Sequence, residues 1–297
     1  MHQYVRRIAC AAVTDPQSLI VDHDGLRINA LDWGGDGPPL LLQHPNGFCA
    51  GFFDPVAQAL RDGFHPFGVD VRGHGASERP ESLAECTFPN VTRDVLAVLD
   101  AFGFDEIVAL GHSMGGAIAI MLDELRPGIV RKALLCEAIA FPPGGLPRNA
   151  AGGPNPMSEI ARSRRAVWPD RETVRASYAS RPPMNVLEPD ALAAYVRYGF
   201  HDRDDGQVEL ACAPEVEARC FDAAAEPEGA AHAFGHLDGF GGSLVVVSGD
   251  DSNLPAEVFA AQAEAAGAPY LQLHGSHFFP QEDTARTVGL VREHLGG

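Results

Sequence analysis

One short stretch, residues 106–117, constrains the fold of this chain more than any other: Glu-Ile-Val-Ala-Leu-Gly-His-Ser-Met-Gly-Gly-Ala. The apolar run 107–110 predicts a buried strand and residues 117–122 predict a helix, so Ser113 stands at the turn between them. The G-x-S-x-G spacing is typical of a nucleophile elbow, where a strand runs sharply into a helix. The positions two before and two after the serine crowd each other in such a turn, and both are glycine. The motif predicts a serine nucleophile held in a strained backbone conformation.

Predicted strands and helices alternate on both sides of this stretch. Because parallel strands joined by crossover helices bury both faces of a sheet, the alternation predicts an α/β fold. We expect a mostly parallel central sheet of about eight strands with helices on both faces. The predicted strands are 19–22, 28–33, 40–43, 64–70, 107–110, 132–139, 244–249 and 270–273. The predicted helices outside the interruption described next are 53–60, 91–102, 117–122, 255–266 and 283–295.

The alternation is interrupted between residues 141 and 236. This stretch opens with proline- and glycine-rich sequence and continues in polar, amphipathic segments. The segments are 158–167, 171–179 and 189–198. We therefore expect a core domain made of residues 1–140 and 237–297, with residues 141–236 inserted after the sixth strand as a helical cap.

Charge and composition exclude several classes of partner. The 297-residue chain has a formal net charge of −18, and Lys132 is its only lysine. Nucleic-acid binding requires a clustered basic face, so we expect no nucleic-acid partner. No stretch reaches the length of a membrane-spanning helix, and we expect no membrane partner. The sequence also lacks a glycine-rich phosphate loop, which argues against a nucleotide cofactor.

The six cysteines form no C-x-x-C pair and do not combine with histidines at zinc-site spacing. They are Cys10, Cys49, Cys86, Cys136, Cys212 and Cys220. This pattern favours buried thiols in a reducing, cytoplasmic compartment and predicts no metal site. A Cys212–Cys220 disulfide is the alternative that the spacing leaves open.

Four motifs together resemble the α/β-hydrolase superfamily over nearly the whole chain. They occur in the order and spacing of that superfamily. They are His44-Pro-Asn-Gly47, Asp70-x-Arg-Gly-x-Gly-x-Ser77, Gly111-His-Ser-Met-Gly115 and Gly275-x-His277. The resemblance implies the α/β-hydrolase fold. It is less specific for substrate, because the superfamily contains esterases, lactonases, C–C hydrolases, perhydrolases, lyases and hormone receptors.

The resemblance also implies a base and an oxyanion hole for the serine. A serine hydroxyl is a weak nucleophile without a base, and the superfamily places that base after the last strand, where His277 stands. Its competitor, His274, lies in the alternating pattern of the strand itself. The oxyanion hole needs two backbone donors, for which we expect the N–H groups of Met114 and Asn46. Phe48, beside the Asn46 loop, is expected to face the substrate.

The acidic member of the triad has two candidate positions. The usual position, about three residues past Gly249, is occupied by Ser252, with Asp250 and Asp251 just before it. A minority of the superfamily instead carries the acid at the end of the strand after the nucleophile helix, where Glu137 is the lone charge in an apolar run. A buried carboxylate is costly unless it has a partner such as a catalytic histidinium. We expect Glu137 to be the acid and keep Asp250 and Asp251 as alternatives.

These residues predict hydrolysis of a carboxylic ester or lactone through an acyl-enzyme, with His277 deprotonating Ser113. The partner is then a small-molecule ester or lactone, and no cofactor or metal is expected. A serine at the elbow argues against epoxide hydrolysis and haloalkane dehalogenation, because both need a carboxylate nucleophile. The alternatives are a C–C bond hydrolase or a perhydrolase on the same triad, and a small-molecule receptor without turnover.

Overall fold

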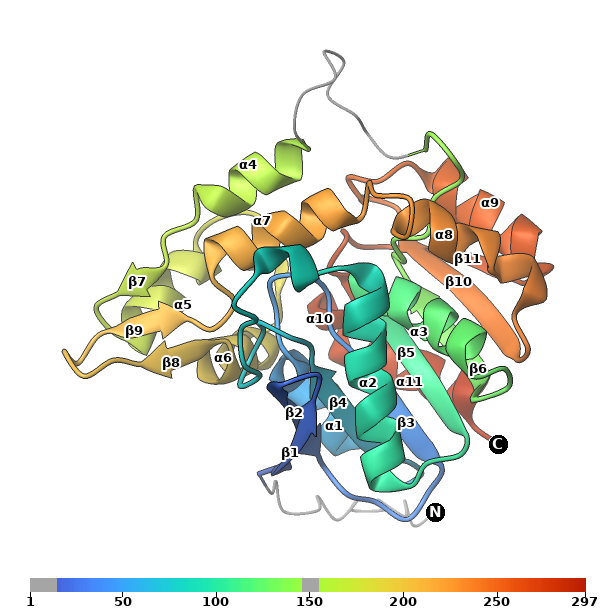
Figure 1. The fold of residues 1–297 in the computed structure, drawn as a ribbon, viewed down its shortest axis with the longest axis horizontal. Coiled ribbons are helices and arrows are strands. Elements are labelled where there is room, and N and C mark those ends of the chain that lie inside the picture. The colour runs from blue at the N-terminus through green and yellow to red at the C-terminus, as the bar shows by residue number, and fades with distance from the viewer. Residues whose placement is uncertain (1–14, 146–154) are drawn as a thin grey trace, which may run out of the picture.

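The computed structural model describes residues 15–145 and 155–297 and is built on one eight-stranded sheet (Figure 1). The strand order is β1-β2-β4-β3-β5-β6-β10-β11. The strands are β1 (Gln17–His23), β2 (Leu26–Asp32), β3 (Pro39–Gln43), β4 (His65–Asp70), β5 (Ile107–His112), β6 (Val130–Cys136), β10 (Ser243–Gly249) and β11 (Tyr270–Leu273). Only the β1–β2 and β2–β4 pairs of this sheet are antiparallel. The predicted mostly parallel sheet is confirmed.

Helices cover both faces of the sheet, and alternation along the strands explains why. Leu41 of β3 packs in the same apolar cluster as α2 and α3, whereas its neighbours Leu40 and Leu42 pack with α1 and α11. Successive strand side chains point to opposite faces, so a strand buried on both sides is apolar throughout. The helices of the core are α1 (Asp54–Leu60), α2 (Phe88–Phe102), α3 (Met114–Leu125), α9 (Ala256–Ala266), α10 (Phe279–Glu282) and α11 (Thr284–Leu295).

We call the segment between β6 and β10 the inserted segment. Most of its elements lie to one side of the sheet, whereas its last α-helix packs against α3 of the core (Figure 1). Its helices are α4 (Pro156–Arg162), α5 (Arg171–Ala179), α6 (Pro189–Tyr198), α7 (Pro214–Ala223) and α8 (Ala230–Gly235). Its strands are β7 (Val167–Trp168), β8 (Phe200–Asp202) and β9 (Val208–Leu210). Short 3-10 helices are η1 (Ala50–Phe53) and η2 (Leu83–Glu85) in the core, and η3 (Met184–Val186) and η4 (Leu237–Gly239) in the inserted segment.

A helical cap is expected from the sequence, but the inserted segment also contains strands. β7, β9 and β8 form a three-stranded antiparallel sheet, and the helix expected over 158–167 ends at Arg162. The turn between β8 and β9 contains Asp205-Gly206, a pair that favours tight hairpin turns, with Gly206 at φ +79°. Residues 1–14 and 146–154, which the predicted domain boundaries include, lie outside the described residues.

The five cysteines of the described residues are all free and buried, so Cys212 and Cys220 form no disulfide. Cys10 lies outside the described residues.

In the ranges 15–145 and 155–297, no helix combines the length and the apolar character needed to cross a bilayer.

Candidate active site

Ser113 occupies the turn between β5 and α3 with φ +57° and ψ −117°. A non-glycine residue in such a conformation carries strain of about 1–3 kcal/mol and requires a surrounding structure that enforces it. The flanking glycines, Gly111 and Gly115, allow the close backbone packing that holds Ser113 in this conformation. A Cβ on Gly111 would lie 2.4 Å from the carbonyl oxygen of Gly115, and a Cβ on Gly115 would lie 2.2 Å from that of Gln43. Only glycine fits at either position, and the strand can then turn directly into the helix.

Glu137 and His277 meet beside this turn. Glu137 follows β6 at φ +53°, and its side chain is completely buried. One carboxylate oxygen, Oε2, accepts hydrogen bonds from His277 Nδ1 at 3.0 Å and from Ser252 Oγ at 2.6 Å. The other, Oε1, accepts from the N–H of Gly249 at 2.7 Å. With Nδ1 donating to the carboxylate, the neutral imidazole keeps its lone pair on Nε2, the arrangement a general base needs.

In the described structure, neither alternative acid forms a hydrogen bond or an ion pair with His277. Asp250 accepts a hydrogen bond from the N–H of Gly275 at 3.0 Å and lies 3.2 Å from Nδ1 of the exposed His274. The Gly275 hydrogen bond, followed by that of His274, lowers the pKa of Asp250. Asp251 reaches the cavity described below, while its backbone N–H donates to the Gly275 carbonyl. Among the described residues, Glu137 is therefore the carboxylate that holds His277.

His112 contacts the backbone of His277, although it is not among the predicted site residues. Its Nε2 donates to the backbone carbonyl of His277 at 2.8 Å, and the two rings lie 5.1 Å apart. Burial, followed by the field of His277, lowers the pKa of His112 well below the ordinary value, so the ring is neutral. This contact helps to hold the backbone of His277 in place. Its only sequence signal is the position directly before the serine.

The predicted oxyanion-hole residues lie on the two expected elements. Met114 is the first residue of α3, where a backbone N–H has no partner within the helix and the helix dipole favours negative charge. Asn46 lies in the loop after β3, and its side-chain Nδ2 donates to the carbonyl of Glu217 at 2.9 Å. The side-chain amide is thus engaged in holding the loop, which leaves the backbone N–H of Asn46 as the candidate donor.

Two buried histidines support the Asn46 loop without adding positive charge. The N–H of Gly47 donates to His74 Nε2 at 3.1 Å. Burial lowers the pKa of His74 to about 3, with His44 as a second cause, and burial lowers the pKa of His44 to about 4. Both rings are neutral at pH 7, and they act as fixed hydrogen-bonding groups.

The inserted segment also holds this loop. Tyr195 of α6 donates its hydroxyl hydrogen to the carbonyl of Gly47 at 3.1 Å. Arg164 donates to the same hydroxyl at 2.9 Å and forms an ion pair with Glu217, whose backbone carbonyl receives Asn46. The position of the loop therefore depends on both parts of the chain.

A cavity of about 1430 Å³ lies between the core and the inserted segment, and its lining surface is mostly apolar. Ser113, Met114, His277, Asn46 and Phe48 all line it. The Phe48 ring also stacks on Phe52 at 4.4 Å, so it belongs to the packed core as well as to the cavity wall. His277 is hydrogen-bonded to Glu137. Among the described residues, no hydrogen bond joins the His277 ring to Ser113 Oγ in this structure. Catalytic hydrogen bonds of this kind often tighten only when substrate binds.

Comparison with known proteins gives the same picture of the fold. A family model described as "alpha/beta hydrolase fold" matches residues 38–203. Epoxide hydrolase A of Mycobacterium tuberculosis is 28% identical over 138 residues, which cover 46% of this chain and 43% of that protein. Non-heme chloroperoxidase of Streptomyces lividans is 32% identical over 123 residues, covering 40% of this chain and 44% of that protein. The chain thus matches less than half the length of either relative.

Similarity to solved structures extends over almost the whole chain. The thioesterase domain from the curacin biosynthetic pathway superposes with a TM-score of 0.78 at 19% sequence identity. The superposition covers 94% of this chain and 99% of that domain. At this level of identity the likeness establishes the fold alone.

Proposed function

The chain belongs to the alpha/beta hydrolase family, and from that premise we propose that it hydrolyses a carboxylic ester or lactone through an acyl-enzyme on Ser113. The observation that carries the proposal is the buried Glu137 carboxylate hydrogen-bonded to His277 Nδ1 in the loop that faces the elbow serine. A carboxylate in this position holds the imidazole in the tautomer that can accept a proton. The same carboxylate stabilises the imidazolium once the proton has moved.

In the proposed reaction His277 acts first as a base and then as an acid in each half of the cycle. His277 Nε2 takes the proton from Ser113 Oγ as the oxygen attacks the substrate carbonyl carbon. The negative charge that develops on the carbonyl oxygen is stabilised by the N–H groups of Met114 and Asn46. His277 then gives its proton to the leaving alkoxide, and the C–O bond breaks to leave an acyl-serine. His277 then deprotonates a water molecule, which attacks the acyl carbon. The bond from that carbon to Ser113 Oγ breaks, His277 returns the proton to Ser113 Oγ, and the carboxylic acid is released.

The similarity to a protein named epoxide hydrolase does not lead us to propose epoxide opening. That reaction requires a carboxylate nucleophile that forms an alkyl-ester intermediate, and the elbow position holds Ser113. The Glu137 carboxylate, which holds the base, is completely buried, and its oxygens are occupied by His277, Ser252 and Gly249. It supports a base rather than attacking a substrate.

The cavity favours a substrate with a bulky apolar group. Ligand pockets commonly measure about 300–1,000 Å³, and the 1430 Å³ cavity exceeds that range. Met157, Trp168 and Met184 of the inserted segment contribute apolar lining to the cavity that Ser113 faces. We therefore propose that the inserted segment acts as a cap that selects the substrate by its apolar part, whereas the elbow side receives the carbonyl.

A covalent label tests the nucleophile directly. A fluorophosphonate probe should label the wild-type protein and the Ser180→Ala variant, whose exposed serine lies on the inserted segment, but not the Ser113→Ala variant. Esterase activity should fall about 10⁵- to 10⁶-fold in Ser113→Ala and stay unchanged in Ser180→Ala. Labelling that persists in Ser113→Ala would contradict the proposal. Failure of the folded wild-type protein to react would favour a receptor without turnover.

A substrate panel then separates the reactions that share this triad. Steady-state rates on p-nitrophenyl esters of increasing chain length, on lactones and on diketones should show turnover of the first two classes, with a preference for longer acyl chains. Adding hydrogen peroxide tests for perhydrolysis, which replaces water in the second half of the reaction. Turnover confined to diketones would replace this proposal with C–C bond hydrolysis.

A further inference from the structure

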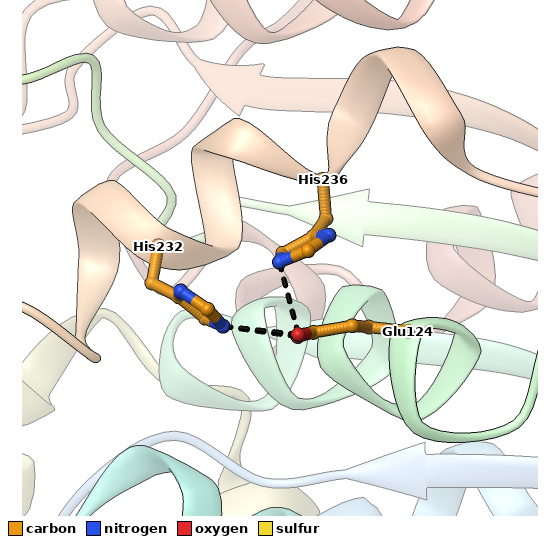
Figure 2. Close-up of side chains that lie close together, drawn as sticks. All are labelled: Glu124, His232 and His236. Atoms are coloured by element: carbon orange, nitrogen blue, oxygen red, sulfur yellow. Dashed lines mark hydrogen bonds and ion pairs between the residues drawn. The ribbon is translucent and has the colours of Figure 1, made fainter.

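Glu124, His232 and His236 form a second carboxylate–histidine cluster, outside the active-site cavity (Figure 2). Glu124 lies in the last turn of α3, His232 lies on α8, and His236 directly follows α8. Figure 2 shows both imidazole rings turned toward the Glu124 carboxylate. His232 Nε2 lies 3.1 Å from Oε2, and His236 Nε2 lies 3.1 Å from Oε1. The three potential ligand atoms all lie within 4.8 Å of one another.

The ligand types and spacing match a zinc site. Histidines four positions apart on a helix project from the same face, and two imidazoles with one carboxylate are a known zinc-binding set. Zinc bonds of about 2.0–2.1 Å in tetrahedral geometry separate neighbouring ligand atoms by roughly 3.3–3.5 Å. The two nitrogen–oxygen separations of 3.1 Å are within a few tenths of an ångström of that value. All three ligand atoms lie within 4.8 Å of one another, so side-chain rotation can bring them around one ion.

The surroundings favour a cation and give it access. The site lies at the C-terminal ends of α3 and α8, where the helix dipoles present partial negative charge. The three side chains are 28–36% exposed, which leaves room for a water molecule as fourth ligand and a path for the ion. The neighbouring carboxylate of Asp123 is unavailable, because its oxygens accept hydrogen bonds from the N–H groups of Gly128 and Gly241.

We propose that Glu124, His232 and His236 bind one Zn²⁺ ion, with water completing a tetrahedral site. The ion would join α3, the helix that begins beside Ser113, to α8, the last α-helix of the inserted segment before β10. An open fourth position is typical of catalytic zinc, but these three residues do not line the active-site cavity. The ion would therefore act by connecting two elements that are far apart in sequence. This inference does not depend on the proposed esterase activity.

Zinc titration of the metal-free protein tests the proposal. After treatment with EDTA and dialysis, isothermal titration with ZnCl₂ should give one high-affinity site per chain. His232→Ala, His236→Ala and Glu124→Gln should each weaken that site at least tenfold. His201→Ala, which removes an exposed histidine from β8, should leave it unchanged and serves as the matched control. Co²⁺ in place of Zn²⁺ should give the strong visible absorption of a tetrahedral complex in the wild-type protein only.

Thermal unfolding provides a second readout that does not use activity. A free Zn²⁺ concentration one hundred times Kd should raise the Tm of the wild-type protein by about 5 °C and leave the His232→Ala/His236→Ala double variant unchanged. Circular dichroism on the metal-free variants shows whether they are folded before titration. Equal zinc affinity in the wild type and the folded double variant, or no binding to the wild type, would overturn the proposal.

Discussion

Two carboxylate–histidine clusters flank α3, and they differ in burial and in the number of imidazoles. At the N-terminal end, Glu137 is completely buried and holds one imidazole, that of His277. At the C-terminal end, Glu124 is partly exposed and shares its carboxylate between His232 and His236. The residue types are the same, so the difference in environment determines what each cluster can do.

The buried cluster is fully specified by its hydrogen bonds. A carboxylate removed from water must be compensated, and Glu137 receives donors from Gly249, Ser252 and His277. The exposed cluster has no such requirement, because water screens its charges and the side chains can rotate. Burial therefore orients a single base for proton transfer. Partial exposure with two imidazoles instead leaves a site open to an added ion.

The largest expected effect comes from removing the buried charge. Glu137→Gln keeps the shape of the side chain but cannot stabilise an imidazolium at His277. We expect kcat on the best ester substrate to fall about 10³- to 10⁴-fold, equivalent to ~4–5 kcal/mol in the activation barrier. Asp250→Asn and Asp251→Asn should each lower kcat less than tenfold. A loss of the Glu137→Gln size in either aspartate variant would transfer the role of triad acid to that residue.

The next effect concerns acid stability near the buried cluster. The pKa of His44 is about 4 in the folded protein, below the ordinary value of 6.5, so the unfolded chain binds the proton first as pH falls. The stability linked to His44 is therefore complete above about pH 6.5 and is lost progressively as pH falls toward 4. Between pH 7 and 4.5 the wild type should lose about 2.5 kcal/mol more than His44→Asn, measured by urea unfolding. Parallel pH curves for the two proteins would contradict a neutral, buried His44.

A smaller effect is expected from the hydroxyl that supports Glu137. Ser252→Ala removes the donor at 2.6 Å from Oε2 but leaves the contacts of Gly249 and His277 in place. We expect kcat to fall about tenfold, equivalent to ~1.4 kcal/mol, with KM changed less than twofold. Ser252→Thr retains a hydroxyl and should recover part of the loss. An unchanged kcat in Ser252→Ala would mean that the remaining contacts suffice to orient Glu137.

The smallest effect belongs to the exposed cluster without metal. In the presence of EDTA, Glu124→Gln should change the free energy of unfolding by less than about 1 kcal/mol, because partly exposed ion pairs contribute little. With zinc added, the gap between this variant and the wild type should widen. A large destabilisation in EDTA alone would show that the cluster is itself a strong structural contact and would remove the contrast with Glu137.

Several features of the fold could be predicted because the evidence for them is local in the sequence. The strand at Tyr270–Leu273 and the helices at Arg171–Ala179 and Pro189–Tyr198 have the predicted bounds, since their apolar periodicity is clear. The small sheet β7-β9-β8 was not predicted, although Asp205-Gly206 carried a hairpin signal. Its strands are only two or three residues long, which is too short for alternation to be recognised.

The sequence by itself determined the elbow and the approximate place of the base, because G-x-S-x-G encodes a crowding of backbone atoms within five consecutive residues. Tertiary structure decided which carboxylate contacts His277. Glu137 lies 140 positions away, and the two meet because β6, β10 and β11 are neighbours in the sheet. It also decided the second cluster. The His232-x-x-x-His236 spacing was visible, but its carboxylate is 108 positions earlier on α3. Short-range backbone geometry is written in adjacent residues, whereas a contact between distant side chains exists only after the sheet and its helices have packed.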